Sequence, residues 1–485
     1  MSPRGKVDIP WPLSSFPGST PQESAGRLIN CHSEPLGENG PARAAYHRSP
    51  GLTQYASTAN TGYRGGLIVN NLSYETWSGT AATVDGSGNV VVLGAFAGTK
   101  KVTIARNQSA TPNVVAVDID NGAFTLSGGA PTSYNGGGNM VGVPNSVCFQ
   151  DGYLFFTIAA GQCQATNVNS LTMNALTFTT AQAKSSVTLL RGIAYSGVLF
   201  LFTTASAEVY QDTANAVPGF PYTRLVVLEY GLIQANAIAG WEDGFSILMW
   251  VAQDFGVYLM PPGSLAPTKV SPPDLDRLIE AQVRAGATLE AGCYIIQGKK
   301  FWTISSPSWS WEFNLSSQKW NERWSLNTSG MQGRWRATGG HPAFGKWLMG
   351  DVQSGVLAFV DDTVLTELGN PQLRRIESSP AVDFPNRIRV ARADFNFSTG
   401  AGIAIGAAPN IINPVVAISW SDDDGITWKN PLVRSLGLQD KSLRTRVSVK
   451  NTGLSGPQAR RWRLDDTDCA APFMSATQSD DPREN

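Results

Sequence analysis

Short runs of β-forming residues recur along the middle of the chain, separated by turns rich in Gly, Asn, Asp and Ser. Markers for five successive runs are Tyr153, Leu199, Phe245, Phe301 and Trp347. The markers lie roughly 46, 46, 56 and 46 residues apart, near the 40–50 residues of a propeller blade. A lone hairpin of such runs cannot bury both faces. The spacing therefore predicts units that stack around a common axis as a β-propeller.

This pattern predicts an all-β protein with a β-propeller of six or seven blades over residues 58–379. The most regular unit has one strand at residues 243–248, entered through Gly244, and a second strand at residues 255–259. Residues 274–283 are the one segment that predicts a helix, because Leu275 and Ile279 have helical spacing after a Pro-rich start.

Two regions lie outside the repeat. Residues 1–57 are rich in Pro, Ser, Gly and Arg, with isolated apolar residues such as Trp11, and they predict an extended docking arm. Residues 380–474 contain strand-like alternation and predict a C-terminal β domain or a closing blade. Residues 475–485 are expected to form a polar tail.

One motif in the C-terminal region is typical of a hairpin turn. Residues 421–428 fit the pattern S-x-D-x-G-x-T-W, the Asp-box of sialidase-type β-propellers. The acid can bind backbone N–H groups, Gly can adopt positive φ, and we expect Trp to anchor the next strand in an apolar layer. We interpret the motif as a structural staple rather than a catalytic element. Its residues are Ser421, Asp423, Gly425, Thr427 and Trp428.

Charge is scarce: 15% of residues are charged and the formal net charge is -1. Low surface charge suggests a surface covered by partners, and the chain lacks a run of like charges that would hold nucleic acid. Arg461 and Arg463 could suggest a basic DNA patch, but they alternate with Trp462 and Leu464 as on a strand with one buried face. We also expect neither a signal segment nor a membrane span.

The candidate chemistry is equally sparse. The chain has five cysteines without a C-x-x-C pair and three scattered histidines, His32, His47 and His341. This favours folding in a reducing cytoplasm and predicts no metal site, no cofactor and no catalytic residues. Two alternatives stay open. One is a sialidase-like glycoside hydrolase on a β-propeller, which would need paired carboxylates or a Tyr nucleophile. The other is a receptor-binding tail module.

Several short motifs occur together in a fixed order along the chain. They are Phe16-Pro17-Gly18-Ser19-Thr20, Arg27-Leu28-Ile29-Asn30-Cys31, Pro218-Gly219-Phe220-Pro221-Tyr222, Glu229-Tyr230-Gly231, Asp394-Phe395-Asn396-Phe397 and Arg434-Ser435-Leu436-Gly437. With these motifs the chain resembles the packaged-DNA stabilisation proteins of short-tailed bacteriophages, also called tail accessory, hub or nozzle proteins. Residues 456–463 follow the family pattern loosely and residues 59–137 show little similarity, so partner-facing loops are expected to differ.

The resemblance implies a non-enzymatic virion protein of the phage tail, assembled in the cytoplasm of the host bacterium. Its relatives look like β-propeller subunits that form a homo-hexamer below the portal and its head-to-tail adaptor. The implied partners are that adaptor, a tail needle, plug or tailspike proteins, and packaged double-stranded DNA that passes without sequence-specific binding. The ring would retain the genome and later form its conduit for ejection.

Overall fold

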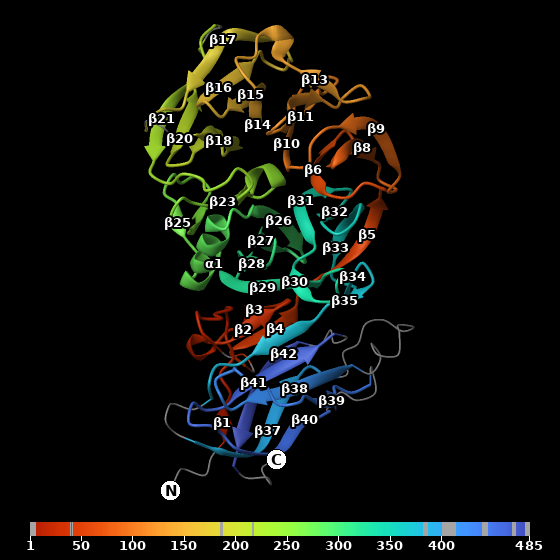
Figure 1. Ribbon diagram of the computed structural model, residues 1–485, viewed down its shortest axis with the longest axis vertical. Helices are drawn as coiled ribbons and strands as arrows, with labels where there is room; N and C mark the ends of the chain where they lie inside the picture. The colour runs from red at the N-terminus through yellow and green to blue at the C-terminus, as the bar shows by residue number, and fades with distance from the viewer. Residues whose placement is uncertain are drawn as a thin grey trace.

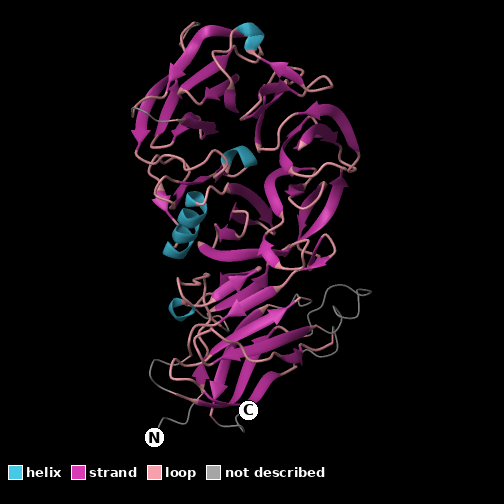
Figure 2. Cartoon of the chain, in the orientation of Figure 1, coloured by secondary structure: helices cyan, strands magenta, loops and turns pink. Residues whose placement is uncertain are grey.

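The computed structural model describes residues 6–38, 40, 42–184, 188–215, 218–381, 387–399, 414–438, 445–467 and 472–480. Strands dominate the molecule, which consists of a ring of small sheets above a second β module (Figures 1 and 2). The helical elements in the described residues are α1 (Pro273–Arg284) and the 3-10 turns η1 (Pro21–Glu23), η2 (Gly136–Gly138) and η3 (Trp241–Asp243). The predicted helix is thus confirmed as α1, with Leu275 and Ile279 buried.

Seven successive four-stranded antiparallel units, here called blades 1 to 7, lie within the described residues. Blade 1 contains β6 (Tyr63–Val69), β7 (Leu72–Trp77), β8 (Gly79–Val84) and β9 (Val90–Phe96), and blade 2 contains β10 (Val102–Arg106), β11 (Val114–Asp118), β12 (Gly122–Thr125) and β13 (Thr132–Tyr134). Blade 3 contains β14 (Pro144–Gln150), β15 (Tyr153–Ile158), β16 (Gln162–Thr166) and β17 (Met173–Thr180), and blade 4 contains β18 (Leu189–Tyr195), β19 (Val198–Thr203), β20 (Ala207–Asp212) and β21 (Tyr222–Leu228).

The first strands of successive blades contact one another around a closed ring, with η3 beside β22 completing the step from blade 4 to blade 5. This arrangement confirms the predicted β-propeller. Blade 5 contains β22 (Ile238–Ala239), β23 (Leu248–Val251), β24 (Val257–Met260) and β25 (Thr268–Lys269). Blade 6 contains β26 (Glu290–Ile296), β27 (Lys299–Ser305), β28 (Ser310–Asn314) and β29 (Lys319–Leu326). Blade 7 contains β31 (Ala337–Ala343), β32 (Lys346–Asp351), β33 (Val356–Asp361) and β5 (Gly51–Ser57).

Local sequence explains why the blades form where they do. In β19, four consecutive apolar residues are buried, because blades packed on both faces cover both sides of a central strand. The hairpin before β19 turns at Ser196 and Gly197, which both have positive φ. Asp151 and Gly152, in the turn between β14 and β15, also have positive φ. Two-residue turns of this kind match the twist of the flanking strands.

Blade 7 is completed by a strand from the other end of the chain. β5 pairs antiparallel with β33, with Leu52 opposite Val360. The Thr53 hydroxyl donates a 2.8 Å hydrogen bond to Asp361 across 308 residues of sequence. Leu52 is 2% exposed and belongs to the main propeller core. The ring is therefore closed by backbone pairing between the beginning and the end of the propeller sequence.

The second module is a β-sandwich with one apolar core between two sheets. Trp11, Trp462 and Phe473 are among the core residues. One sheet has the order β3 (Cys31–Pro35), β4 (Ala44–Arg48), β42 (Phe473–Ser479), β37 (Arg389–Phe397) and β40 (Val447–Leu454), with β1 (Val7–Asp8) beside β42; the other has β2 (Arg27–Ile29), β36 (Arg374–Glu377), β41 (Arg461–Asp466), β38 (Val415–Ser421) and β39 (Leu432–Ser435).

The sandwich and the propeller share a sheet. β2 pairs in parallel with β29 of blade 6 and antiparallel with β36 of the sandwich. Arg27 on β2 forms a 2.6 Å ion pair with Glu322 on β29. Asn30 donates side-chain hydrogen bonds to the carbonyl oxygens of Trp324 (2.9 Å) and Leu373 (2.7 Å). Three short strands extend these sheets: β30 (Gln332–Arg334) beside β29, and β34 (Thr366–Glu367) and β35 (Asn370–Pro371) beyond β5.

The ends of the chain differ from the sequence-based expectation. Residues 1–57, expected as an extended docking arm, supply β1 to β4 to the sandwich and β5 to blade 7. Residues 475–479, expected in a polar tail, belong to β42 in the interior of a sandwich sheet, and residues 481–485 lie outside the described part. Of the two alternatives for residues 380–474, the described part forms a β domain, a sandwich that N-terminal strands complete, rather than a closing blade. Short strands whose partners are hundreds of residues away leave little local pattern.

Strand β5 offers a direct test of ring closure. We expect Leu52→Ala to lower the free energy of unfolding by about 2–5 kcal/mol, because it removes a buried side chain from the propeller core. Denaturant titration measures the change. Gln54→Ala, at an exposed position of the same strand, is the matched control and should leave stability nearly unchanged. Equal stability of the Leu52→Ala protein and the parent would contradict the closure.

Candidate functional site

The Asp-box closes the hairpin between β38 and β39. Ser421 Oγ donates to Asp423 Oδ1 (2.7 Å) and accepts from the Gly425 N–H (2.8 Å). Asp423 Oδ1 also accepts from the Thr427 N–H (2.8 Å), and Oδ2 accepts from the Thr427 hydroxyl. Burial alone would raise the pKa of Asp423, but these bonds hold it below its usual value. Gly425 has φ +89°, which favours glycine.

Trp428 lies apart from this network. Its ring is partly exposed, and the Arg463 guanidinium lies over it at 4.5 Å from the centroid. The sequence predicts an apolar anchor here, whereas the chain leaves the sheet after Ser421 and has not re-entered a strand at Trp428. The buried Trp462 on β41 fills the sandwich core instead.

The acids inside the box bind buried arginines of β41 and the residue before it. Arg460 is fully buried and donates to Asp422 (2.8 Å). Arg461 is 3% exposed, forms a 3.4 Å ion pair with Asp424 and donates to the Ser24 carbonyl (2.6 Å). These two arginines are thus occupied within the fold. The predicted burial of alternate residues on β41 is correct for Trp462, but Arg461 is buried as well.

The box therefore joins the hairpin, β41 and the N-terminal loop. The sequence carries a signal for this contact: three consecutive acids at 422–424 and a pair of arginines at 460–461. Charges of opposite sign in two separate runs of a low-charge chain are natural partners.

Two substitutions in the Asp-box test whether its hydrogen bonds or its tryptophan contribute more to stability. We expect Trp428→Ala to lower the free energy of unfolding by about 1 kcal/mol, the range for a partly exposed cation–π contact. Asp423→Ala should cost more, about 1–3 kcal/mol, because it leaves hydrogen-bond donors without their acceptor. Denaturant unfolding measures both, with Ile426→Ala in the same hairpin as an exposed control. A greater loss for Trp428→Ala than for Asp423→Ala would contradict this assignment.

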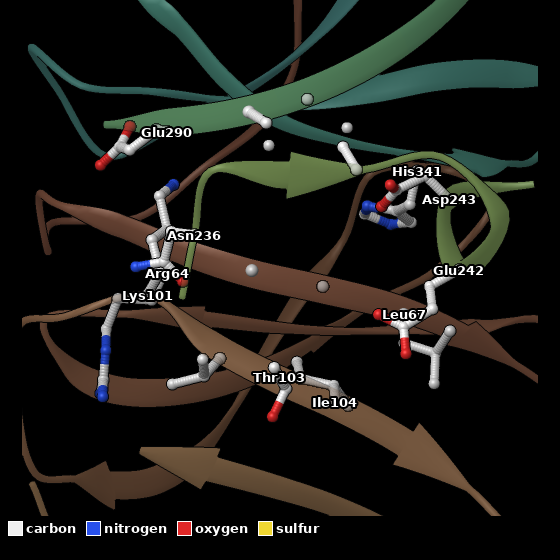
Figure 3. A pocket seen from close by; sticks show the side chains of 18 of the residues that line it. Arg64, Leu67, Lys101, Thr103, Ile104, Asn236, Glu242, Asp243, Glu290 and His341 are labelled. Atoms are coloured by element: carbon white, nitrogen blue, oxygen red, sulfur yellow. The ribbon is translucent and has the colours of Figure 1, made fainter. Parts of the chain in front are cut away.

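A cavity of about 270 Å³ lies at the propeller axis, lined by the first strands of several blades and by η3 (Figure 3). Arg191 on β18 pairs with Glu242 on η3 in its wall at 2.8 Å. Burial raises the pKa of Glu242 and of Asp243. Burial would also raise the pKa of Glu290, but the charges of Lys101 and then Arg334 outweigh it and lower this pKa to about 2.

A buried cluster beside the cavity contains a serine, a histidine and an acid. His341 Nε2 lies 2.9 Å from Ser73 Oγ and 3.1 Å from Glu75 Oε1. In a Ser-His-acid triad the serine and the acid bind opposite ring nitrogens, whereas here they share one. Tyr63 also donates to Glu75, at 2.8 Å. The cluster is therefore a polar clamp between blade 7, which carries His341, and blade 1.

Two histidines lie where the sandwich meets blade 6. The rings of His32 and His47 stack with centroids 5.9 Å apart, and His32 meets Phe301 edge-on at 5.2 Å. Lys299 Nζ lies 3.5 Å from His32 Nε2 and 2.6 Å from Glu34 Oε2. A cavity of about 140 Å³ adjoins the pair. Burial and then the Lys299 charge lower the pKa of both histidines, that of His32 far more.

The histidine pair does not extend to a metal site. Over the described residues, no group of three or more His, Cys, Asp or Glu side chains is placed to hold a metal ion. Cys469 lies outside those residues. The four described cysteines are all buried and unpaired. Within the same part of the chain, every helix is too short or too polar to cross a bilayer.

The histidine pair predicts a pH dependence of folding. Because both folded-state pKa values are lowered, the unfolded chain binds more protons below pH about 6.5, and stability should fall as the pH decreases through that value. The enclosed His32 should contribute up to about 1.4 kcal/mol per pH unit, and the partly exposed His47 less. Thermal melting across this pH range measures the effect, and His32→Asn should flatten the profile. A parent protein whose profile is already flat would contradict the prediction.

Comparison with known proteins gives one family. The family model described as Bacteriophage P22 Gp10, beta-propeller, matches residues 30–365. No curated protein matches the chain. The WD40 β-propeller domain of Doa1 has a TM-score of 0.39 at 9% identity, with 64% of this chain and 97% of that chain covered.

A second similar structure is the computationally designed Ika8 protein, with a TM-score of 0.35 at 10% identity and coverage of 63% of this chain and 99% of that chain. The family match spans most of the chain, including all seven blades, and it confirms the resemblance found in the sequence. The chain belongs to the Bacteriophage P22 Gp10 β-propeller family of phage DNA-stabilisation proteins.

Proposed function

We propose that this protein is a ring-shaped hub, or nozzle, of the phage tail. Six copies would lie below the portal and its adaptor, retain the packaged DNA and form its conduit during ejection. The observation that carries the proposal is the family match over residues 30–365, which indicates a phage DNA-stabilisation protein and a place in the virion. The adaptor above and a needle, plug or tailspikes below are the proposed neighbours.

The size of the axial cavity supports a conduit built from several copies. About 270 Å³ at the axis of one propeller cannot admit a duplex whose major groove alone is about 12 Å wide. Gly66 and Gly340 in the cavity wall stand against neighbouring atoms with no space for a side chain, so the wall is already tightly packed. The proposed conduit would therefore run between propellers rather than through one.

The burial of several arginine side chains supports a protein that retains DNA without binding its phosphates. Arg64, Arg323, Arg374 and Arg460 are fully buried. Arg64 pairs with Asp118, and Arg374 pairs with Asp466 at 2.8 Å. These side chains cannot reach a DNA backbone. A channel wall that neutralises few phosphates lets DNA slide and adds little salt-dependent affinity.

The same observations weigh against a glycoside hydrolase. Hydrolysis needs two carboxyl groups, or a Tyr nucleophile with an acid, at an open cleft. Tyr63 and Glu75 are hydrogen-bonded to each other but are 4% and 0% exposed. In the axial cavity Glu242 is paired with Arg191, Glu290 is paired with Arg334 at 3.1 Å, and Asp243 accepts the Gly240 N–H at 2.8 Å. Glu242 and Asp243 lie on one 3-10 turn, next to each other in sequence. We propose that the protein has no catalytic role and that its Asp-box is structural.

Particles made without the protein provide the test. We expect them to fill with DNA and then lose it, whereas parent particles should keep their genome across a wide range of salt, because steric retention does not depend on counterion release. Nuclease protection of packaged DNA measures retention, and imaging should place six copies on the tail axis. Stable, infectious particles without the protein, or three copies on peripheral spikes, would overturn the proposal.

A further inference from the structure

The outer rim of the first blades is unusually apolar. β9 and β17, the outer strands of blades 1 and 3, contain no charged residue, and β21 of blade 4 contains only Arg224. On β9, Val91 and Val92 are each 61% exposed. Leu176 on β17 is 67% exposed and Leu225 on β21 is 53% exposed. Apolar side chains grouped on a strand at the edge of a sheet mark a surface that another protein covers.

The chain itself covers the rims of other blades. The outer strand of blade 6, β29, is paired with β2 and β30, and the outer strand of blade 7, β5, is paired with β34. In the part of the chain that the structure describes, β9, β17 and β21 end their sheets and have no such neighbour. Blades 1, 3 and 4 thus leave apolar edges open where blades 6 and 7 do not.

Bulges decide the type of contact that these edges allow. The pairing of β8 with β9 shifts register between Ala81 and Ala82, and the pairing of β20 with β21 shifts between Val209 and Tyr210. A bulged edge does not continue a regular ladder of hydrogen bonds into a new strand. The edges therefore suit contact through side chains rather than extension of the sheet.

The rim of blade 1 and the rim of blades 3 and 4 lie on opposite sides of the propeller, with β9 at the right and β21 at the left in Figure 1. The rims of blades 3 and 4 touch each other, since the Thr177 hydroxyl donates to the Pro218 carbonyl (3.2 Å). A closed ring of identical subunits needs two different surfaces on each copy, one for each neighbour. Because both rims are nearly free of charge, they can meet without juxtaposing like charges.

We propose that the blade 1 rim of one copy, with Val91 and Val92, packs against the rim of blades 3 and 4 of the next copy, with Leu176 and Leu225. The occupant of each rim is thus a second copy of this chain in head-to-tail contact. This inference rests on the proposed ring and adds the surfaces that build it.

Cysteine cross-linking in assembled particles tests the contact directly. Val91→Cys and Leu225→Cys would be combined in a Cys469→Ser background and treated with a short bismaleimide. The remaining cysteines are buried, and burial raises the pKa of Cys148, Cys163 and Cys293, so they should not react. We expect a ladder of linked chains from the double variant and none from either single variant.

Charge insertion gives an independent measurement. Val91→Glu with Val92→Glu should reduce the number of copies per particle about tenfold or more, because carboxylates would be buried at the contact without partners. Met331→Glu, at a position 64% exposed outside both rims, is the matched control and should incorporate normally. The melting temperature of each purified variant verifies that folding is intact.

Three outcomes would overturn the inference: no linkage in the double variant, linkage of Val91→Cys to itself, or normal incorporation of the Val91→Glu, Val92→Glu protein. Imaging of parent particles separates this failure from failure of the proposed function. A ring without the expected linkage overturns only the assignment of the surfaces. Particles with no ring on the tail axis overturn the hub proposal as well.

Discussion

The pairing of β2 with both β29 and β36 is the constraint on which the arrangement of the whole chain depends. Its backbone hydrogen bonds run in one direction to the propeller and in the other to the sandwich. Leu28 and Ile29 on this strand are fully buried. β5 then follows β2 by about twenty residues and completes blade 7. One short N-terminal stretch therefore fixes the propeller, the sandwich and the joint between them.

Many of the charged side chains of this protein lie in its interior. Arg323 is fully buried, lies 4.3 Å from the Trp335 ring and pairs with Glu312 (3.7 Å) and Glu367 (3.6 Å). Breaking such a buried pair from one side typically costs about 3–5 kcal/mol, because the remaining charge is left uncompensated. Since many of the few charges are used inside the fold, the surface is even less charged than the composition suggests. This agrees with a protein that works within an assembly.

The sequence predicted the propeller because its signals are local. Successive strands of one blade are neighbours in sequence, and their turns contain residues such as Asp151 and Gly152 that tolerate positive φ. It indicated a C-terminal β domain, but not the N-terminal strands of that sandwich or the closing strand β5, whose partners lie hundreds of residues away. The second half of β42 looks like a polar tail because Ser475, Thr477, Gln478 and Ser479 surround the single apolar residue Ala476. For the candidate site, the Asp-box hydrogen bonds follow the motif, but the position of the Trp428 ring depends on a tertiary contact with Arg463.

Closure of the ring by its two ends has a consequence for synthesis. Thr53 leaves the ribosome 308 residues before Asp361, so β5 must wait unpaired while the other blades are made. Pairing over such a distance is slow, and an unpaired apolar strand is exposed to aggregation in the meantime. A chain interrupted before β33 contains β5 but not the strand with which it pairs, so it cannot form a closed propeller. Closure of the propeller therefore has to wait until the end of blade 7 has been translated.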